Sequence, residues 1–347
     1  MDGSACPIRH PFAEPPEAGK ATEVAEGVLW LRLPLPMRLD HVNVWALDDG
    51  DGWTLIDTGF DTGKSREIWK MALSGPLADR PVRRLVVTHH HPDHLGLAGW
   101  FQARGVELLA TRTAWLYGRM LTLDVQQTVV PEQVAFWRAA GMEPERLARR
   151  MAERPWNFAD VVAPMPLGFT RLRDGERLRM GGRDWEILTG DGHAPEHATF
   201  WSCDDDLLIA GDQILPGISP NIGVYPTEPQ ADPLGEWLDS CRRFARRAEE
   251  RHLVLPGHKL PFTGLPARLS QMIDNHESAL DRLRDHLRSP QTACGCMQVL
   301  FGREVEEAVH GLALVETLAH LNRLRAAGLA TAEPGPEGAV LWHAVEA

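Results

Sequence analysis

The chain has 347 residues, of which 44% are hydrophobic and 24% charged, so it suffices for one large domain with an appendage or for two domains. Its formal net charge of −12 argues against a general nucleic-acid binder, which needs a cationic surface. No run of about 18 apolar residues is present to cross a bilayer, and no secretory signal is visible, so we expect a cytoplasmic protein. The five scattered cysteines are consistent with reduced thiols in that compartment.

The first half of the chain predicts strands and then helices. Residues 1–22 are rich in Pro, Glu, Ala and Gly, and indicate an irregular N-terminal arm. Short runs with β-branched and aromatic residues predict strands, and apolar residues at helical spacing predict helices. The expected elements are strands at 28–33, 41–47 and 53–56, a helix at about 64–73, a strand at 84–88 and a helix at about 95–104. From 111 to 164 the pattern becomes helical, with many Trp, Met and Phe side chains.

The second half predicts more strands and a helical tail. The expected elements are strands at 177–180, 185–188, 198–201, 207–210 and 252–255, and helices at about 234–250, 271–287, 305–310 and 313–327. A turn at 333–338 and a strand at 339–342 follow the last helix. Two helices followed by a small hairpin are the outline of a winged helix.

The densest group of chemically active residues is Thr88-His89-His90-His91-Pro92-Asp93-His94-Leu95-Gly96. His89 and His91 alternate at the end of a strand, so a loop can aim both imidazoles at one point. Asp93 and His94 then begin a helix, and direct a carboxylate and a third imidazole to a neighbouring point. This set of ligands suits a divalent cation such as Zn²⁺. A lone histidine is usually a surface or core residue, but four potential ligands within six positions predict a metal site.

Further potential ligands follow other predicted strands, each close to a glycine. They occur in the segments Gly192-His193, Gly211-Asp212 and Gly257-His258. Glycine allows a sharp turn that brings the next side chain inward. Alone, Asp212 would be read as a turn cap and His258 as a surface histidine. The shared context of strand, glycine and ligand favours a common site instead.

These residues resemble the metallo-β-lactamase superfamily, whose motif His-x-His-x-Asp-His stands here as His89, His91, Asp93 and His94. The resemblance covers about residues 22–265. It implies an α/β fold, the four-layer αββα sandwich, for residues 23–265, with residues 111–164 as a helical insertion. Residues 266–347 would form a winged-helix-like C-terminal domain, similar to the extension on some members of the superfamily.

The resemblance also implies a role for each candidate residue. The ligands of the first metal would be His89, His91 and His193, those of the second Asp93, His94 and His258, and Asp212 would bridge the two. Asp57, in Ile56-Asp57-Thr58-Gly59, would brace the ligands from behind. His90 and His197 fall at positions that do not bind metal.

The chemistry implied is hydrolysis by a hydroxide shared between two divalent cations, which attacks a carbonyl carbon or phosphorus. Asp93 would orient that hydroxide and take up its proton. Zn²⁺ is the default metal, and Fe or Mn also accept such ligands. Oxygen-reducing members of the superfamily commonly carry glutamate at the position of His91, so the histidine here favours hydrolysis over redox chemistry.

The substrate is expected to be a small molecule, a thioester, ester or lactone with an apolar acyl or aromatic group. The aromatic content of 111–164 suits a lid over an apolar pocket, or equally the packing of helices against the body or a second subunit. Trp115 and Tyr117 in that segment, and Tyr225, are the candidate substrate residues. The chain resembles glyoxalase II, a thioesterase, but the residues that bind glutathione there are not recognisable.

Two alternatives remain. Some relatives similar to the β-lactamase-like protein 2 group cleave RNA, so an endoribonuclease or phosphodiesterase is one. However, residues 280–347 hold six Arg against nine Asp plus Glu, so this tail is expected to pack against the body or a partner subunit, as in a homo-oligomer. The second alternative is a catalytically silent protein that senses a metabolite. Loss of metal ligands from the sequence would indicate such a protein.

Overall fold

The computed structural model describes residues 8–345, and their contacts divide into two compact units. The first unit comprises residues 8–125, 157–220 and 244–269, and the second comprises 126–156, 221–243 and 270–345. The helical segment 126–156, which the sequence placed inside the catalytic domain, therefore groups with the C-terminal residues. In the described part of the chain, no helix has both the length and the apolar character needed to span a membrane.

The first unit contains a seven-stranded sheet whose strands follow one another in chain order. The strands are β1 (Thr22–Ala25), β2 (Val28–Pro34), β3 (His41–Asp48), β4 (Trp53–Ile56), β5 (Val82–Val86), β6 (Glu107–Thr111) and β7 (Thr170–Leu172). Neighbours from β1 to β4 pair antiparallel, and those from β4 to β7 pair parallel. The parallel half directs the carboxyl ends of β4, β5 and β6 to the same edge of the sheet.

A second sheet of five strands has the order β12-β11-β10-β9-β8. Its strands are β8 (Arg177–Met180), β9 (Arg183–Gly190), β10 (His197–Ser202), β11 (Leu207–Gly211) and β12 (Leu253–Pro256). The inner faces of the two sheets share one apolar core, in which Trp30 and Trp45 of the first sheet meet Trp185 and Phe200 of the second. The sheets thus form the middle layers of a sandwich.

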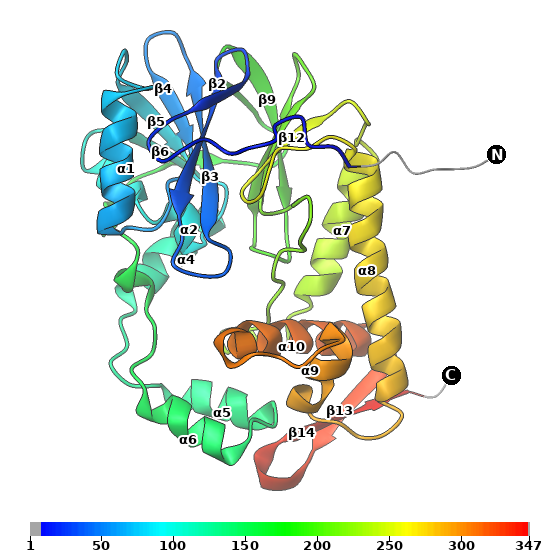
Figure 1. The fold of residues 1–347 in the computed structure, drawn as a ribbon. Helices are drawn as coiled ribbons and strands as arrows, with labels where there is room; N and C mark the ends of the chain where they lie inside the picture. Colours follow the sequence, from blue (N-terminus) through cyan, green and yellow to red (C-terminus); the bar gives the residue numbers. More distant parts are fainter. Residues whose placement is uncertain (1–7, 346–347) are drawn as a thin grey trace, which may run out of the picture. The chain divides into compact units, whose positions relative to one another are not determined.

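Helices form the outer layers (Figure 1). The first unit holds α1 (Gly63–Ser74), α2 (Pro92–Leu95), α3 (Ala98–Gln102), α4 (Arg112–Leu123) and the 3₁₀ turn η1 (Phe158–Asp160). Trp69 of α1 and Phe101 of α3 pack edge to face at 5.0 Å, in a core on the outer face of the first sheet. On the outer face of the second sheet, Trp201 packs against Phe244, near the end of α7 (Pro233–Ala245). This is the αββα arrangement that the sequence predicted.

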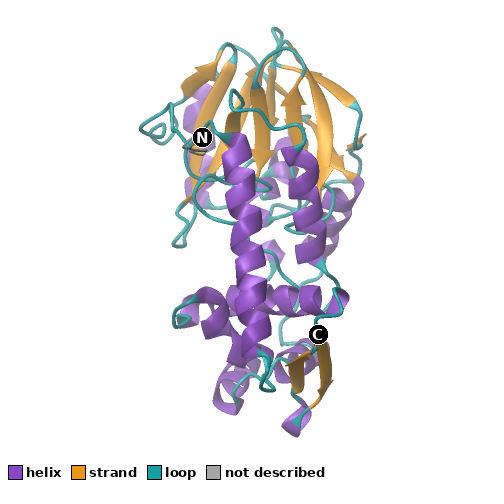
Figure 2. Ribbon diagram, turned by 90° about the vertical axis from the view of Figure 1, so that its right-hand side faces the viewer, coloured by secondary structure: helices purple, strands orange, loops and turns teal. Residues whose placement is uncertain are grey.

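The second unit is helical apart from one hairpin (Figure 2). Besides most of α7, it contains α5 (Pro131–Ala139), α6 (Pro144–Ala152), most of α8 (Leu265–His286), α9 (Ala293–Phe301), η2 (Glu307–Val309), α10 (His310–Ala326), β13 (Ala330–Pro334), η3 (Pro336–Gly338) and β14 (Val340–Ala344). The amide of Cys294 donates to the carbonyl of Ala140 at 2.9 Å, and Arg146 pairs with Glu307 at 2.9 Å. The α5–α6 segment is therefore fixed to the C-terminal helices.

The structure differs from the predicted elements in two respects. In place of the helix expected at 95–104, α2 ends at Leu95 and α3 begins at Ala98, because the backbone leaves the helical region at Leu97, which has a φ of −99° and a ψ of 11°. Strands β1, β6 and β7 and helix α9 were not anticipated. Helix α9 does carry signals, because Thr292 caps its first turn and Gly302 ends it with a φ of 64°.

Candidate metal centre

All seven candidate ligands lie at strand ends, where both sheets open at the same edge. His89 and His91 follow β5, and the chain then enters α2, which carries Asp93 and His94. From the second sheet, His193 follows β9, Asp212 follows β11 and His258 follows β12. The two sheets thus bring together residues separated by up to 169 positions, and the packing of the sheets fixes their meeting point.

The ligand atoms form three overlapping groups. The groups are His89, His91 and His193; His89, His94 and Asp212; and Asp93, His94 and His258. Within each group, one ligand atom per residue lies within 4.8 Å of the others. Asp212 is central, since its carboxylate lies 3.4 Å from His94 Nε2, 3.7 Å from His193 Nε2 and 3.1 Å from His258 Nε2.

These separations fit metal coordination. With metal–ligand bonds of about 2.0–2.2 Å, two ligand atoms on one tetrahedral ion lie roughly 3.4 Å apart. The Nε2 atoms of His89 and His193 are 3.3 Å apart, and His258 Nε2 lies 3.3 Å from Asp93 Oδ2. In addition, His94 Nε2 and Asp212 Oδ1 are buried and face each other at 3.4 Å, without a hydrogen bond of good geometry. An imidazole nitrogen and a carboxylate oxygen at this separation suit a shared cation.

Asp57 orients two of the candidate ligands, His94 directly and His89 through Thr88. Its carboxylate accepts hydrogen bonds from His94 Nδ1 at 2.8 Å and from the amide and hydroxyl of Thr88, each at 2.8 Å. Because the Thr88 hydroxyl hydrogen goes to Asp57, its oxygen accepts from His89 Nδ1 at 3.0 Å. Both imidazoles are thereby held with Nδ1 as the donor, which directs each Nε2 atom at the site. Asp57 itself has a left-handed φ of 63° and is buried.

His258 is oriented from the first sheet. Its Nδ1 donates to the carbonyl of His41 at 2.7 Å, which again leaves Nε2 for the site. Gly257, immediately before it, leaves no room for a side chain, since a Cβ would collide with the Asp212 carboxylate and lie 2.8 Å from the ring of His94. The glycine predicted to precede this ligand is therefore required by close approach.

Two imidazoles of the first group, those of His89 and His91, are held neutral. Burial lowers the pKa of His89 and of His91 well below the ordinary value, and the neighbouring imidazoles act in the same direction. A neutral imidazole offers the lone pair that a metal needs. His89 and His91 are therefore prepared to bind a cation at neutral pH.

In the group Asp93–His94–His258, the pKa values of the imidazoles are shifted in the opposite direction. Burial alone would lower the pKa of His258, but Asp212 and Asp93 raise it to about 10, and the same carboxylates raise that of His94 well above the ordinary value. Burial alone would raise the pKa of both carboxyls, but the two imidazoles lower it. Both carboxylates are therefore ionised at neutral pH, and binding of a cation in place of the imidazole protons would release protons.

The two histidines expected not to bind metal support the site from its edges. His197 Nε2 accepts the amide of Asp212 at 3.1 Å, and its ring stacks on that of His89 at 4.5 Å. His90 is buried, and its ring lies 5.1 Å from that of Tyr117 and 6.4 Å from that of Phe158. Its Nδ1 has no hydrogen-bond partner.

The three candidate substrate residues lie in different surroundings. Tyr117 contacts His90, as just described, and so lies next to the ligand segment. Trp115 stacks on Phe169 at 4.8 Å against the core of the first sheet, which accounts for its burial by packing. Tyr225 belongs to the second unit, where its side chain is 46% exposed.

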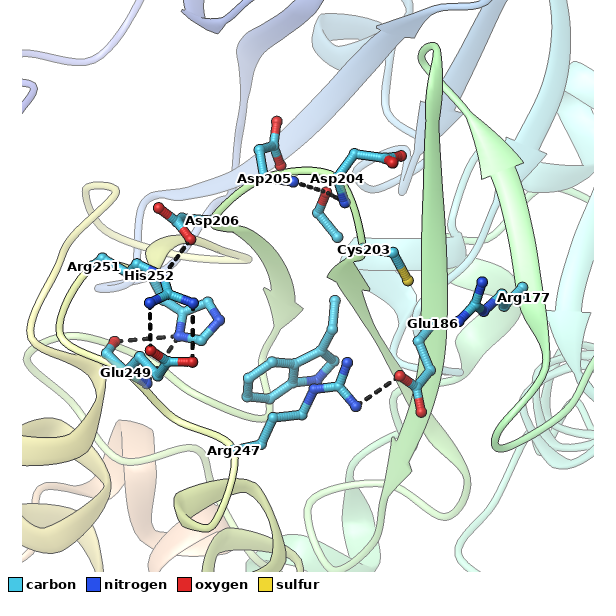
Figure 3. A pocket seen from close by; sticks show the side chains of 12 residues that line it. Arg177, Glu186, Cys203, Asp204, Asp205, Asp206, Arg247, Glu249, Arg251 and His252 are labelled. Atoms are coloured by element: carbon cyan, nitrogen blue, oxygen red, sulfur yellow. Dashed lines mark hydrogen bonds and ion pairs between the residues drawn. The ribbon is translucent and has the colours of Figure 1, made fainter.

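A surface hollow lies away from the candidate ligands. A hollow of about 470 Å³ lies at the opposite ends of β10, β11 and β12 from the ligands, and is lined by charged side chains (Figure 3). Its charges largely pair with one another: Arg247 with Glu186, and Arg251 with Asp206, both at 2.6 Å. This hollow contains none of the seven candidate ligands.

The sequence missed His41, Asn43 and Thr88 as supporting residues. Each is a buried polar residue in or beside an apolar strand. The alternation of His41 and Asn43 in β3 was the available signal, because both side chains lie on one face of the strand. What they contact, the loop around His258, is more than 200 positions away and gives no local pattern.

Comparison with known proteins identifies the fold and the chemistry of the family. The family model of the metallo-beta-lactamase superfamily matches residues 37–258, and that of the metallo-beta-lactamase-like C-terminal domain matches 280–345. A crystal structure of a beta-lactamase domain protein from Burkholderia ambifaria is 36% identical, with a TM-score of 0.89 over 97% of this chain and 98% of that one. The "Probable metallo-hydrolase YqjP" of Bacillus subtilis is 27% identical over 87% of this chain and 93% of its own length.

A more distant relative is named for a specific activity. A hydroxyacylglutathione hydrolase of Hahella chejuensis is 24% identical over 52% of each chain. A metallo-beta-lactamase family protein of Thermus thermophilus is 27% identical, with a TM-score of 0.78 over 93% of this chain and all of that one. Similarity over nearly the full length thus includes both the sandwich and the C-terminal region.

Proposed function

The chain belongs to the metallo-beta-lactamase superfamily and is a metal-dependent hydrolase, and from this premise we propose that it uses two divalent metal ions to hydrolyse a thioester, ester or lactone. The observation that carries the proposal is the convergence of five imidazoles and two carboxylates at one sheet edge, at separations that fit coordination of cations.

The proposed ligands divide into two sets that share one residue. His89, His91 and His193 would hold the first ion, Asp93, His94 and His258 would hold the second, and Asp212 would serve both. The nitrogen-rich donor set favours Zn²⁺ over harder cations, which prefer oxygen. When bound, such a pair lowers the pKa of a water molecule and polarises a carbonyl oxygen.

Asp93 is the residue that we propose moves the proton. Its carboxylate is 17% exposed, whereas that of Asp212 is 8% exposed, so Asp93 is the more accessible of the two acids. His94 and His258 keep the pKa of Asp93 low although burial opposes them, so it is ionised and can accept a proton at neutral pH. Asp57 contributes by position only, because its carboxylate hydrogen bonds face Thr88 and His94.

We propose that the substrate contacts the wall formed by His90, Tyr117 and Phe158. The wall combines a phenol, an imidazole nitrogen without a partner and an apolar ring, beside the His89–His91 segment. Such a mixture suits an acyl group that is apolar with one polar substituent. The relation to a hydroxyacylglutathione hydrolase supports a carbonyl substrate of the thioester class.

Turnover and metal content together test the proposal. The purified protein would be assayed by elemental analysis and with a phenylacetyl thioester, a p-nitrophenyl ester and an aromatic lactone. We expect two equivalents of metal, loss of turnover after chelation, and a fall of about 10²–10⁴-fold in kcat/KM for Asp93→Ala. Asp239→Ala, at an exposed carboxylate of α7, is the matched control and should not change the rate. Activity that survives complete metal removal would reject the proposal. Cleavage of single-stranded RNA at moderate salt without ester turnover would favour the nuclease instead.

A further inference from the structure

The loop that carries His258 is held by two side chains of the first sheet. Asn43 Nδ2 donates to the carbonyls of Pro256 and Lys259, both at 2.9 Å, and the Asn43 amide donates to the carbonyl of Gly257 at 2.7 Å. The amide of Lys259 in turn donates to His41 Nε2 at 2.9 Å. Hydrogen bonds from a single strand therefore fix the whole segment from Pro256 to Lys259.

His41 is itself fixed in the form that this contact needs. Its Nδ1 donates to the carboxylate of Asp40 at 2.6 Å, so its Nε2 is the acceptor that faces Lys259. The backbone carbonyl of the same residue accepts from His258. His41 thus holds both the ligand and the residue after it.

Asn43 is held just as firmly. Its Oδ1 accepts from Trp30 Nε1 at 2.9 Å and from Arg32 Nε at 3.2 Å, so its Nδ2 must face the loop. Arg32 also donates from Nη2 to the carbonyl of Lys259 at 2.9 Å. Asn43 is completely buried. This arrangement leaves the amide no alternative orientation, because a flip would set its nitrogen against two donors.

The loop is one that requires such support. Lys259 has a left-handed φ of 70°, which is unfavourable for a residue other than glycine, asparagine or aspartate. Gly257 passes so close to Asp212 that small movements would change the approach of His258 to the carboxylate. By contrast, the hydrogen bond that orients His89 runs through Thr88 to Asp57 and does not involve β3.

We propose that His41 and Asn43 are positioning residues that set the affinity of the second metal site, Asp93–His94–His258, and leave the first site nearly unchanged. The inference rests on the two-metal site proposed above. It goes beyond that site because it gives the second ion a support in β3 of its own, in addition to Asp57, which orients a ligand of each ion.

The test measures metal binding directly, by competition with a chromophoric chelator and by elemental analysis, with no substrate. His41→Leu removes the acceptor for Lys259, and Asn43→Ala removes both side-chain donors to the loop. His41→Gln is the conservative variant, since its amide oxygen reaches about the position of Nε2. Val42→Ala, between the two on the same strand but buried in the core of the opposite face, is the matched control for general destabilisation.

We expect His41→Leu and Asn43→Ala to weaken the second equivalent by about 10–100-fold, the usual effect of losing support behind a ligand, and to leave the first within about threefold. His41→Gln should restore the second equivalent, and Val42→Ala should keep both. Circular dichroism identifies any variant that does not fold. If Asn43→Ala does not fold, the comparison of His41→Leu with His41→Gln still tests the inference.

Three results would overturn the inference: an unchanged second equivalent in both variants, an equal loss of both metals, or a Val42→Ala protein that loses the second metal to the same extent. A wild-type protein that binds only one equivalent would overturn it as well. Because no substrate enters the test, failure to find an ester or thioester substrate leaves this result readable on its own.

Discussion

Asp57→Asn is the substitution with the most specific expected consequence. Oδ1 of Asp57 accepts the Thr88 amide, whereas Oδ2 accepts both the Thr88 hydroxyl and His94 Nδ1. The side-chain NH₂ group in Asp57→Asn would therefore face a hydrogen-bond donor whichever way it is turned. The backbone N–H of Thr88 cannot become an acceptor, so the NH₂ group is expected to take the position of Oδ2. There the Thr88 hydroxyl can rotate to accept, and His94 can accept at Nδ1 if that nitrogen gives up its proton and Nε2 carries one.

That tautomer of His94 cannot bind a metal through Nε2. To bind, it must return to the Nδ1–H form and forfeit one hydrogen bond to a charged acceptor, which is worth about 1.5–3 kcal/mol. At about 1.4 kcal/mol for each factor of ten, the affinity for the second metal should fall by roughly 10–150-fold. His89 should change little, because the Thr88 oxygen can still accept from its Nδ1.

The assay is chelator competition on wild type, Asp57→Asn and Asp57→Ala, together with NMR of the imidazole nitrogens in the metal-free proteins. The NMR spectrum should show that Nδ1 of His94 carries a proton in the wild type and has lost it in the Asn variant. Asparagine tolerates the left-handed φ at this position, so the fold should persist. An Asn variant that binds the second metal with wild-type affinity would refute the reasoning.

Three further outcomes are expected. Burial raises the pKa of the Glu316 carboxyl to about 7, so its contribution to folding stability is fully present below pH 4.5 and is lost as the pH rises through 7. Glu316→Gln should therefore raise Tm at pH 8 by an amount equivalent to about 1–3 kcal/mol and change it little at pH 5. Equal Tm changes at both pH values would contradict this. Addition of Zn²⁺ at about 100 times its Kd should stabilise the metal-free protein by about 2.7 kcal/mol, seen as a higher Tm in calorimetry, and a Tm that ignores the ion would count against a resident metal. Arg146→Ala removes the contacts of α6 with Glu307 and His310, and should speed limited proteolysis between residues 126 and 156. The free energy of unfolding of the whole protein should fall by only about 0.5–1 kcal/mol. Arg242→Ala, at another exposed ion pair, is the control and should leave the cleavage rate unchanged.

The sequence predicted the candidate ligands from short segments of the chain, and the family that these segments resemble implied the sandwich. The segment from His89 to His94 carries four potential ligands within one turn and loop, and a glycine immediately precedes each of His193, Asp212 and His258. The structure places all seven side chains together. Their roles as ligands stay a prediction.

The remaining features depend on contacts that are remote in sequence. Strand β6 was not anticipated because its residues, Glu107–Thr111, form a short apolar run that only acquires a partner on each side once β5 and β7 are in place. The grouping of 126–156 with the C-terminal helices likewise depends on Cys294 and Glu307, more than 140 positions later. Local patterns cannot report such pairings.

The division of the candidate ligands between the two sheets has a further consequence. Four of them come from the first-sheet half of the chain and three from the second-sheet half, and the two halves otherwise cohere through the apolar core that they share. An ion held by both would act as a non-covalent cross-link across the sandwich. The supply of metal in the cell would then govern how long the polypeptide survives degradation, as well as how fast it turns over substrate.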